Sequence, residues 1–284
     1  MKYGLIAGNG RFPILALESA RQAGDEIVAI AIKEEAAEQV ESLASQCYWI
    51  SLGELSKLID ICHREGLTQI MMAGQVKHAS IFSSIKPDWR LIKVLAVLDR
   101  KNTDALIGAV RRVLSDEGIE LVDSTLLLKH LLAPEGVLTK RKPEKDEEAN
   151  IQYGRRIAHA LATMDLGQSV AISDRACVAI EAMEGTDAVL RRAASLVEGK
   201  PLTLVKSASR RHHLLFDVPV IGRVTIGTMR ETNTTALAID AGRTLMLDRD
   251  ELLTEADAAK IAIIAYPTDP ELTQRPQTTP RRRP

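Results

Sequence analysis

Short apolar runs alternate with helical segments along the first 76 residues, and this alternation most constrains the fold. The runs are residues 2–7, 27–32, 47–50 and 69–73. Helical spacing follows the first three at residues 11–24, 34–45 and 52–65. Strands alternating with helices predict a parallel sheet covered by helices on both faces. We therefore expect an α/β N-terminal domain over residues 1–132.

Glycine-rich turns follow two of these expected strands. Ligands of parallel sheets bind at the carboxyl ends of the strands. The residues at such ends are Gly8, Asn9, Gly10, Gly74 and Gln75. A strand, a glycine turn and a helix together offer free N–H groups and a helix dipole to an anion. A phosphate or nucleotide site and a plain tight turn are equal alternatives here.

A dinucleotide site is not expected at the first turn. Its fingerprint requires a third glycine, and Pro13 stands at that position. No acidic residue clearly follows the second strand at the position where the dinucleotide fingerprint has the residue that binds ribose. An NAD-dependent, Rossmann-like oxidoreductase is therefore disfavoured.

Two helices are expected at residues 87–98 and 104–114, with a hinge at residues 101–103. Thr103 would cap the second helix, and Asp104 would be favourable in its first turn. The alternative directs Asp104, with Lys101, into a ligand cleft.

A change in composition predicts the domain boundary. Residues 133–150 are dense in charge and contain Pro143, which predicts an exposed linker. Strand and helix patterns resume over residues 151–267, the expected second α/β domain. Residues 268–284 are rich in proline and threonine and end in three arginines, so we expect a disordered tail.

Acidic residues surround a strand-to-helix turn in the second domain. Thr186 is suited to cap a helix, and Asp187 would favour its dipole. Capping does not account for Glu181 and Glu184 beside them. Carboxylates gathered in this way could hold a hard cation.

Asp217 lies in the apolar stretch from Leu214 to Gly227. Phe216 and Val218 flank it. A carboxylate in such surroundings needs a partner, because burying it unpaired is costly. The basic residues upstream are Lys206, Arg210, Arg211, His212 and His213. Acid and bases together suit an anionic substrate held with a divalent cation, and a strand-end cap is the equal alternative.

Composition excludes some functions. The formal net charge is −1 and aromatic residues make up 3%, which argues against nucleic-acid binding. The three cysteines lack metal or disulfide spacing and are expected as buried thiols in a reducing compartment. No signal peptide or membrane-spanning run is expected. The expected location is the cytoplasm, with peripheral contact to the inner membrane left open.

Four segments in order carry a family resemblance: GLIAGNGRFP, AGQV, AMEGTDAVLRR and FDVPVIGRVTI. With these segments, the chain resembles the LpxI family of UDP-2,3-diacylglucosamine pyrophosphatases of lipid A biosynthesis. The resemblance implies a Rossmann-like N-terminal domain, a distinct C-terminal domain and a substrate between them. It implies Mg²⁺ or Mn²⁺ and water attack on the α-phosphorus, giving UMP and 2,3-diacylglucosamine 1-phosphate (lipid X). The expected partners are the lipid-linked UDP-sugar and a second copy in a homodimer.

The resemblance also implies site residues. Asp217 and Lys206 would be catalytic, and Asp217, Glu184 and Asp187 would hold the metal. Arg211 would stabilise phosphoryl charge beside Lys206. The substrate-binding set is Gly8, Asn9, Gly10, Arg11, Gly74, Gln75, Asp104, Thr186 and Arg211.

One segment departs from the family pattern. Family members often have lysine-proline-x-glutamine-acid-x-arginine before the aspartate, and this chain has SRRHHLL over residues 209–215. Three explanations are open. His212 and His213 take the place of the usual residues, the substrate differs, or this segment is a variable loop. A non-catalytic binder of a nucleotide sugar or lipid phosphate is the alternative function.

Overall fold

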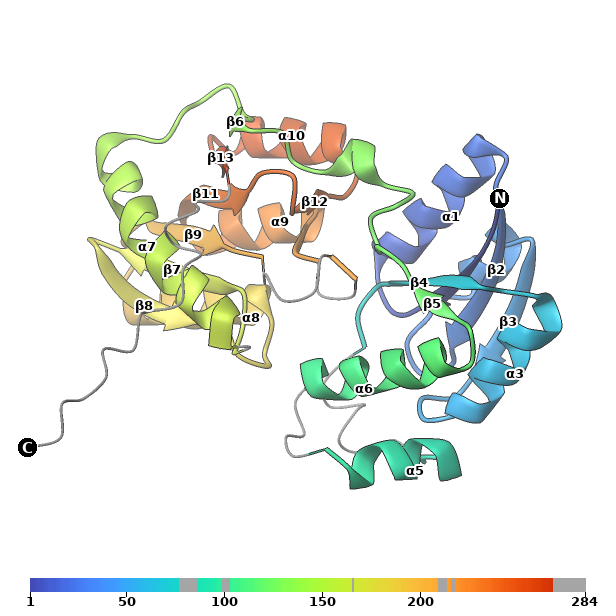
Figure 1. The fold of residues 1–284 in the computed structure, drawn as a ribbon. Coiled ribbons are helices and arrows are strands. Elements are labelled where there is room, and N and C mark those ends of the chain that lie inside the picture. The colour runs from blue at the N-terminus through green and yellow to red at the C-terminus, as the bar shows by residue number, and fades with distance from the viewer. Residues whose placement is uncertain (77–85, 99–102, 165, 209–213, 216–217, 268–284) are drawn as a thin grey trace, which may run out of the picture. The chain divides into compact units, whose positions relative to one another are not determined.

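The computed structural model describes residues 1–76, 86–98, 103–164, 166–208, 214–215 and 218–267. The chain forms two compact units (Figure 1). Unit 1 comprises Met1–Leu132 and Arg211–Val218, and unit 2 comprises Ala133–Arg210 and Pro219–Pro284. Each unit is an α/β structure with its own sheet, so the predicted fold class is confirmed.

Unit 1 contains a parallel sheet with strand order β3-β2-β1-β4-β5. Its strands are β1 (Lys2–Ala7), β2 (Glu26–Ile32), β3 (Gln46–Ile50), β4 (Gln69–Ala73) and β5 (Glu120–Leu121). Its helices are α1 (Arg11–Ala23), α2 (Gln39–Leu43), α3 (Leu55–Glu65), α5 (Trp89–Ala96), α6 (Thr103–Asp116) and the 3₁₀ turn η1 (Lys129–Leu131). Only residues 39–43 of the predicted helix 34–45 are helical.

Both faces of this sheet are covered. Val28 and Ile30 of β2 belong to the hydrophobic cluster that includes residues of α3, α5 and α6. Side chains alternate along a strand, so Ala29 and Ala31 face the other way. Helix α1 contacts β2 and β4 and covers that second face (Figure 1).

Residues 214 and 215 belong to unit 1 although they are distant in sequence. The backbone N–H of Ser124 donates to the carbonyl of Leu214 at 3.0 Å. The Ser124 hydroxyl donates to the carbonyl of Leu215 at 2.6 Å. The Leu215 side chain is 9% exposed and packs in the unit 1 core. The chain therefore leaves unit 2, contributes an anchored segment to unit 1 and returns.

Unit 2 contains a mixed sheet with strand order β6-β13-β11-β9-β7-β8. Strands β9, β11 and β13 run parallel, while β7, β8 and β6 add antiparallel neighbours. The strands are β6 (Gly136–Val137), β7 (Ser169–Ser173), β8 (Ala176–Ile180), β9 (Leu202–Lys206), β11 (Thr234–Asp240) and β13 (Ala262–Tyr266), with a separate pair β10 (Val220–Ile221) and β12 (Leu245–Met246). The helices are α7 (Lys145–Met164), α8 (Thr186–Leu196), α9 (Arg223–Glu231) and α10 (Arg249–Ala258).

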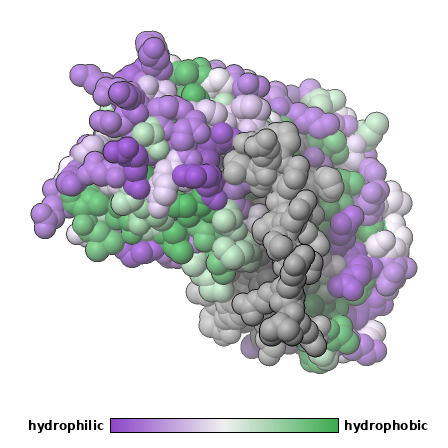
Figure 2. All heavy atoms as spheres, turned by 60° about the vertical axis from the view of Figure 1, so that its left-hand side comes forward, coloured by the Kyte–Doolittle hydropathy of each residue, from purple (hydrophilic) through white to green (hydrophobic). Residues whose placement is uncertain are grey.

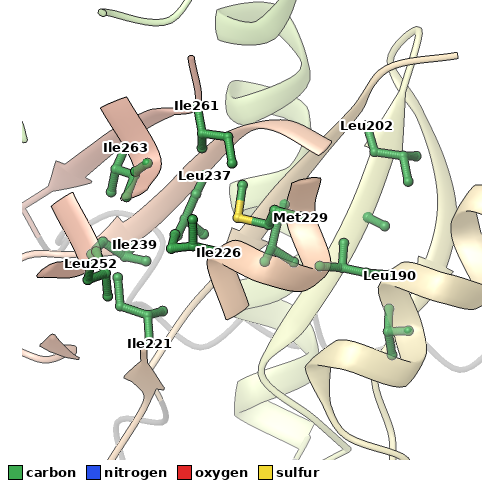
Figure 3. Packing of buried hydrophobic residues seen from close by; sticks show 14 of the residues in the cluster. Leu190, Leu202, Ile221, Ile226, Met229, Leu237, Ile239, Leu252, Ile261 and Ile263 are labelled. Carbon is green, nitrogen blue, oxygen red and sulfur yellow. The ribbon is translucent and has the colours of Figure 1, made fainter. Parts of the chain in front are cut away.

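Apolar side chains from several elements fill the core of unit 2. Figure 3 shows Leu190 of α8, Met229 of α9 and Leu252 of α10 directed toward residues of the sheet. On the other face, Ile151 and Ala158 of α7 pack with residues of β7, β9 and β11. Helices thus cover both faces of this sheet as well. No helix in the described residues is long and apolar enough to span a bilayer.

The segment expected as a linker, residues 133–150, contributes secondary structure to unit 2. It contains β6, which pairs with β13, and the first turn of α7. The charge in this segment is paired and not merely solvated. Arg141 makes two bonds to the Glu147 carboxylate, at 2.7 and 2.8 Å, and donates to the carbonyl of Thr235 at 2.6 Å. This ion pair attaches the segment to strand β11.

Two further differences concern helix α9 and the cysteines. Helix α9 was not among the elements predicted from the sequence. The cysteines are all free, as expected, but only Cys62 is buried, and Cys47 and Cys177 are partly exposed. Burial raises the pKa of the Cys62 thiol to about 11, so it is protonated at neutral pH.

We predict that Glu147→Gln destabilises unit 2 by about 2–4 kcal/mol, because it leaves Arg141 without its carboxylate. Burial raises the pKa of Glu147, but Arg141 and the Thr235 hydroxyl outweigh it and hold that pKa below its usual range. The stabilisation from this ion pair is complete above the pKa of Glu147 in the unfolded chain, about 4.3. It is lost as pH falls through the lower pKa of Glu147 in the folded protein.

Urea unfolding of Glu147→Gln and of a matched control, Glu144→Gln, between about pH 3 and pH 7 tests this prediction. Glu144 provides the control because it is exposed and lies 3.7 Å from Arg141. Equal loss of stability in the two variants would contradict the assignment.

Candidate functional site

The two predicted glycine turns of unit 1 lie side by side. Gly8 donates its N–H to the carbonyl of Ala73 at 2.8 Å. Asn9 and Gln75 exchange backbone hydrogen bonds of 2.7 and 3.0 Å. Strands β1 and β4, which end in these turns, are neighbours at the point where the strand order reverses. Ligands of open parallel sheets bind at this position.

Close backbone approach accounts for two of these glycines. A Cβ on Gly8 would lie 2.7 Å from the carbonyl oxygen of Gln75. A Cβ on Gly74 would lie 2.5 Å from the carbonyl oxygen of Asn9, and Gly74 has φ of +89°. Gly10 is different, because its Cβ direction is open and its φ is +98°. Gly8 and Gly74 thus allow the two turns to approach closely, and Gly10 leaves open space next to them.

Helix α1 starts immediately after this open position. Gly10 is its N-cap, and no side chain caps the helix there. The first turn of a helix has N–H groups without intrahelical partners, and Pro13 lacks this group. The uncapped amides and the dipole of the 13-residue helix can bind an anion.

Side chains near the turns are mostly engaged within unit 1. The Asn9 amide donates to the Glu35 carboxylate at 3.5 Å, and Glu35 is buried. Arg11 pairs with Glu18 of the same helix at 3.3 Å. The backbone of the turns, more than these side chains, is therefore the part of this region that could contact a ligand.

A second cluster forms in unit 2 around Lys206, the last residue of β9. Lys206 is 8% exposed, and its ammonium donates to the Thr186 hydroxyl at 2.9 Å. Thr186 in turn donates to Glu181 at 3.2 Å, and the Ser169 hydroxyl lies 3.1 Å away. The structure thus brings together the predicted residues Lys206 and Thr186. Thr186 is the first residue of α8 and not its cap, which is Gly185.

The predicted metal ligands of unit 2 have different environments. Glu184 is exposed and bonds to Arg192 at 2.8 Å, and backbone N–H groups together with Arg192 lower its pKa. One carboxylate oxygen of Asp187 and one of Glu181 are buried without a hydrogen-bond partner. Within the described residues, no three His, Cys, Asp or Glu side chains form a metal-binding group.

Several predicted residues cannot be placed. Asp217 and Arg211 lie outside the described residues. Asp104 lies in the first turn of α6, and its side chain is also outside the description.

A buried polar network next to Lys206 was not expected from the sequence. The Ser207 hydroxyl donates to the Asp240 carboxylate at 2.8 Å, and the backbone N–H of Ala208 donates to the same oxygen at 2.8 Å. His159 Nδ1 lies 2.6 Å from the Ser207 oxygen. Because the serine proton goes to Asp240, His159 is the donor in this contact. The network fixes the end of β9, and its only sequence signal is three polar residues within apolar runs.

These observations define a class: a two-unit α/β protein with paired glycine turns before an uncapped helix in one unit and a buried lysine in the other. Residues 2–131 match the family model described as the LpxI N-terminal domain, and residues 134–264 match the LpxI C-terminal domain. The chain therefore carries both domains of the LpxI family. It is 29% identical to the UDP-2,3-diacylglucosamine pyrophosphatase LpxI of Caulobacter vibrioides, over 95% of this chain and 98% of that protein.

Solved structures show much weaker similarity. The biotin carboxylase domain of Hydrogenobacter thermophilus 2-oxoglutarate carboxylase is 12% identical, with a TM-score of 0.27 over 61% of this chain and 35% of that one. Phosphoribosylglycinamide synthetase from Anaerococcus prevotii is 15% identical, with a TM-score of 0.26 over 60% of this chain and 31% of that one. These values are too low to support any conclusion.

We predict that Gly74→Ala destabilises unit 1 by about 2–4 kcal/mol, because the added methyl group meets the carbonyl oxygen of Asn9 and the backbone is left-handed. Thermal unfolding measures the effect. Gly118→Ala is the control, since Gly118 has φ of +77° and open space around its Cβ. A smaller loss in the control separates the steric effect from backbone strain, and equal losses would refute the close approach.

We also predict that Ser124→Ala destabilises unit 1 by about 1–3 kcal/mol, since the carbonyl of Leu215 loses a buried donor. Hydrogen exchange should show faster exchange in unit 1 of this variant than in the wild-type protein. Ser115→Ala, on the same unit, provides the comparison. An unchanged unfolding midpoint for Ser124→Ala would rule out the anchor.

Proposed function

We propose that the protein hydrolyses UDP-2,3-diacylglucosamine to UMP and 2,3-diacylglucosamine 1-phosphate. The observation that carries this proposal is similarity to LpxI over nearly the whole chain, including both family domains. In the proposed reaction, water adds to the α-phosphorus and the bond to the bridging oxygen breaks. That oxygen leaves with the sugar 1-phosphate, and UMP retains the oxygen of water.

The glycine turns of unit 1 support binding of the nucleotide diphosphate. The Gly10 position is open, and the uncapped amides of α1 lie directly after it. A diphosphate at this helix end would interact favourably with the N–H groups and the dipole. Gln75, which pairs with Asn9, would contact the ligand on the same side.

Lys206 supports stabilisation of charge on the phosphoryl oxygens. An ammonium group has three N–H donors, and in the described residues Thr186 accepts one of them. Donors thus remain for a phosphoryl oxygen. Because β9 and the Asp240 network hold the strand end, the lysine would need little reorganisation during the reaction. Asp217 and Arg211 complete the proposed set.

A divalent cation, Mg²⁺ or Mn²⁺, is part of the proposal. Mg²⁺ is often held by one or two carboxylates, with waters and substrate phosphates as its other ligands. The buried oxygens of Glu181 and Asp187 that lack partners fit this requirement better than Glu184, which binds Arg192. With Asp217, these residues would hold the cation, which would neutralise the diphosphate and help position water.

Exposed apolar residues beside the lysine cluster support binding of acyl chains. They are Met164, Leu166, Ile180 and Met183. Ile180 and Met183 flank Glu181 in sequence, and the chain at Gly167 lies against the carbonyl of Glu181. Figure 2 shows hydrophobic residues gathered in a band on one face of the molecule. We propose that the diacylglucosamine portion binds beside Glu181.

We predict that Asp217→Asn lowers the rate of UMP release by about three orders of magnitude, because the side chain loses the charge assigned to catalysis. The assay measures UMP from UDP-2,3-diacylglucosamine in mixed micelles, with Mg²⁺ and with chelator. Asp250→Asn is the matched control on α10, where the side chain is exposed. Near-normal turnover by Asp217→Asn would refute its role.

The same assay distinguishes catalysis from binding alone. If the wild-type protein retains the lipid or nucleotide but releases no UMP at any metal concentration, the protein is a binder. Release that persists in chelator would remove the cation from the proposal and leave the reaction itself intact.

A further inference from the structure

Helix α5 of unit 1 has apolar side chains on two opposite faces. Leu91 and Val94 are buried in the unit 1 core. On the other side, Trp89 is 56% exposed, Ile92 is 53% exposed, and Val97, which follows the last turn, is 78% exposed. Trp89 and Ile92 are three positions apart and lie on one face of α5, and the C-cap residue Val97 adds a third exposed apolar side chain at its end. We call these three residues the exposed stripe. A surface helix normally has a polar outer face, so this stripe indicates a partner.

Cationic side chains accompany the exposed stripe. The ammonium of Lys93 lies 4.6 Å from the centre of the Trp89 ring, and the Arg90 guanidinium lies 5.2 Å from it. Lys86, just before the helix, is also exposed. Tryptophan, aliphatic residues and lysine together are typical of helices that lie in the interface of a membrane.

Two acids next to α5, Asp88 and Glu117, have partners within unit 1, and Asp60 of α3 acts on Arg90. Asp88 caps the helix, accepting from the N–H of Leu91 at 2.9 Å and from the N–H of Ser56 at 2.6 Å. Glu117 forms an ion pair with Arg90. Among described residues 86–98, the exposed stripe therefore has positive charge from Lys86 and Lys93 and no exposed acid. Its charge complements an anionic surface.

We propose that the outer stripe of α5, formed by Trp89, Ile92, Lys93 and Val97, docks on the surface of an anionic lipid bilayer. This inference rests on the proposed function in one respect: a diacylated substrate resides in a membrane, so the enzyme has to reach that surface. The apolar side chains would enter the interface, and the lysines would attract anionic headgroups. The opposite face stays packed on unit 1, so docking requires no unfolding of α5.

The chain contains two tryptophans, which allows a direct test. Trp49 is partly buried in β3 and donates to Glu41 at 3.1 Å. Trp49→Phe retains Trp89, and Trp89→Phe retains Trp49. With vesicles of phosphatidylglycerol and brominated phosphatidylcholine, we expect quenching of Trp89 fluorescence and little quenching of Trp49. Equal quenching of both, or of neither, would overturn the proposal.

A sedimentation assay with the same vesicles measures affinity. We expect the double variant Trp89→Ser, Ile92→Ser to bind about tenfold more weakly. Val224→Ser is the control, because Val224 is an exposed apolar residue of α9, 72% exposed. Equal weakening by the control would contradict the assignment.

Two other outcomes identify different explanations. If the double variant changes only the oligomeric state and no variant binds vesicles, the stripe contacts a second copy and the proposal fails. The vesicles contain no substrate, so their binding is independent of hydrolysis. Vesicle binding without UMP release would refute the proposed function alone, and UMP release without vesicle binding would refute only the docking surface.

Discussion

The hydrogen bonds of Ser124 hold a segment from the later part of the sequence in unit 1. They fix Leu214 and Leu215 in unit 1, although the C-terminal family model includes both residues. Leu214 has φ of +61°, a conformation that costs a non-glycine residue about 1 kcal/mol. Burial of Leu215 offsets this cost. Pro219, four residues later, bonds through its carbonyl to β12 in unit 2. The described segments on either side of residues 216 and 217 therefore belong to different units.

Both units place their polar groups according to one topological rule. In unit 1 the glycines at positions 8 and 74 follow β1 and β4, which are adjacent parallel strands. In unit 2, Lys206 and Asp240 end β9 and β11, which are also adjacent and parallel. Neighbouring parallel strands end at the same edge of a sheet, so residues far apart in sequence are brought together. The buried charges of Lys206 and Asp240 are tolerated because each has a hydrogen-bond partner.

Local pattern predicted the strands well, because buried parallel strands are apolar along their length. The local pattern failed for polar side chains whose hydrogen-bond partners are distant in sequence. Arg141 and Glu147 looked like solvated charges, although the Thr235 carbonyl and hydroxyl complete their site. Thr186 looked like a cap, but its hydroxyl serves Lys206, 20 residues away. The contacts of Ser207 with His159 and Asp240 span 48 and 33 residues. No short-range spacing encodes such contacts, so they emerge only from the folded sheet.

Leu215 provides a physical account of the departure from the family motif. The family resemblance implies an arginine here, whereas in this chain the residue is a leucine that is 9% exposed within the hydrophobic cluster of unit 1. An arginine in these surroundings would need a buried partner, since an unpaired buried charge is strongly destabilising. Leucine removes that requirement and keeps the anchor, because Ser124 binds the backbone carbonyl and not the side chain. The change thus exchanges a charge for apolar packing. In the proposed function, positive charge for a diphosphate would then come from other residues, among them Lys206 at the end of β9.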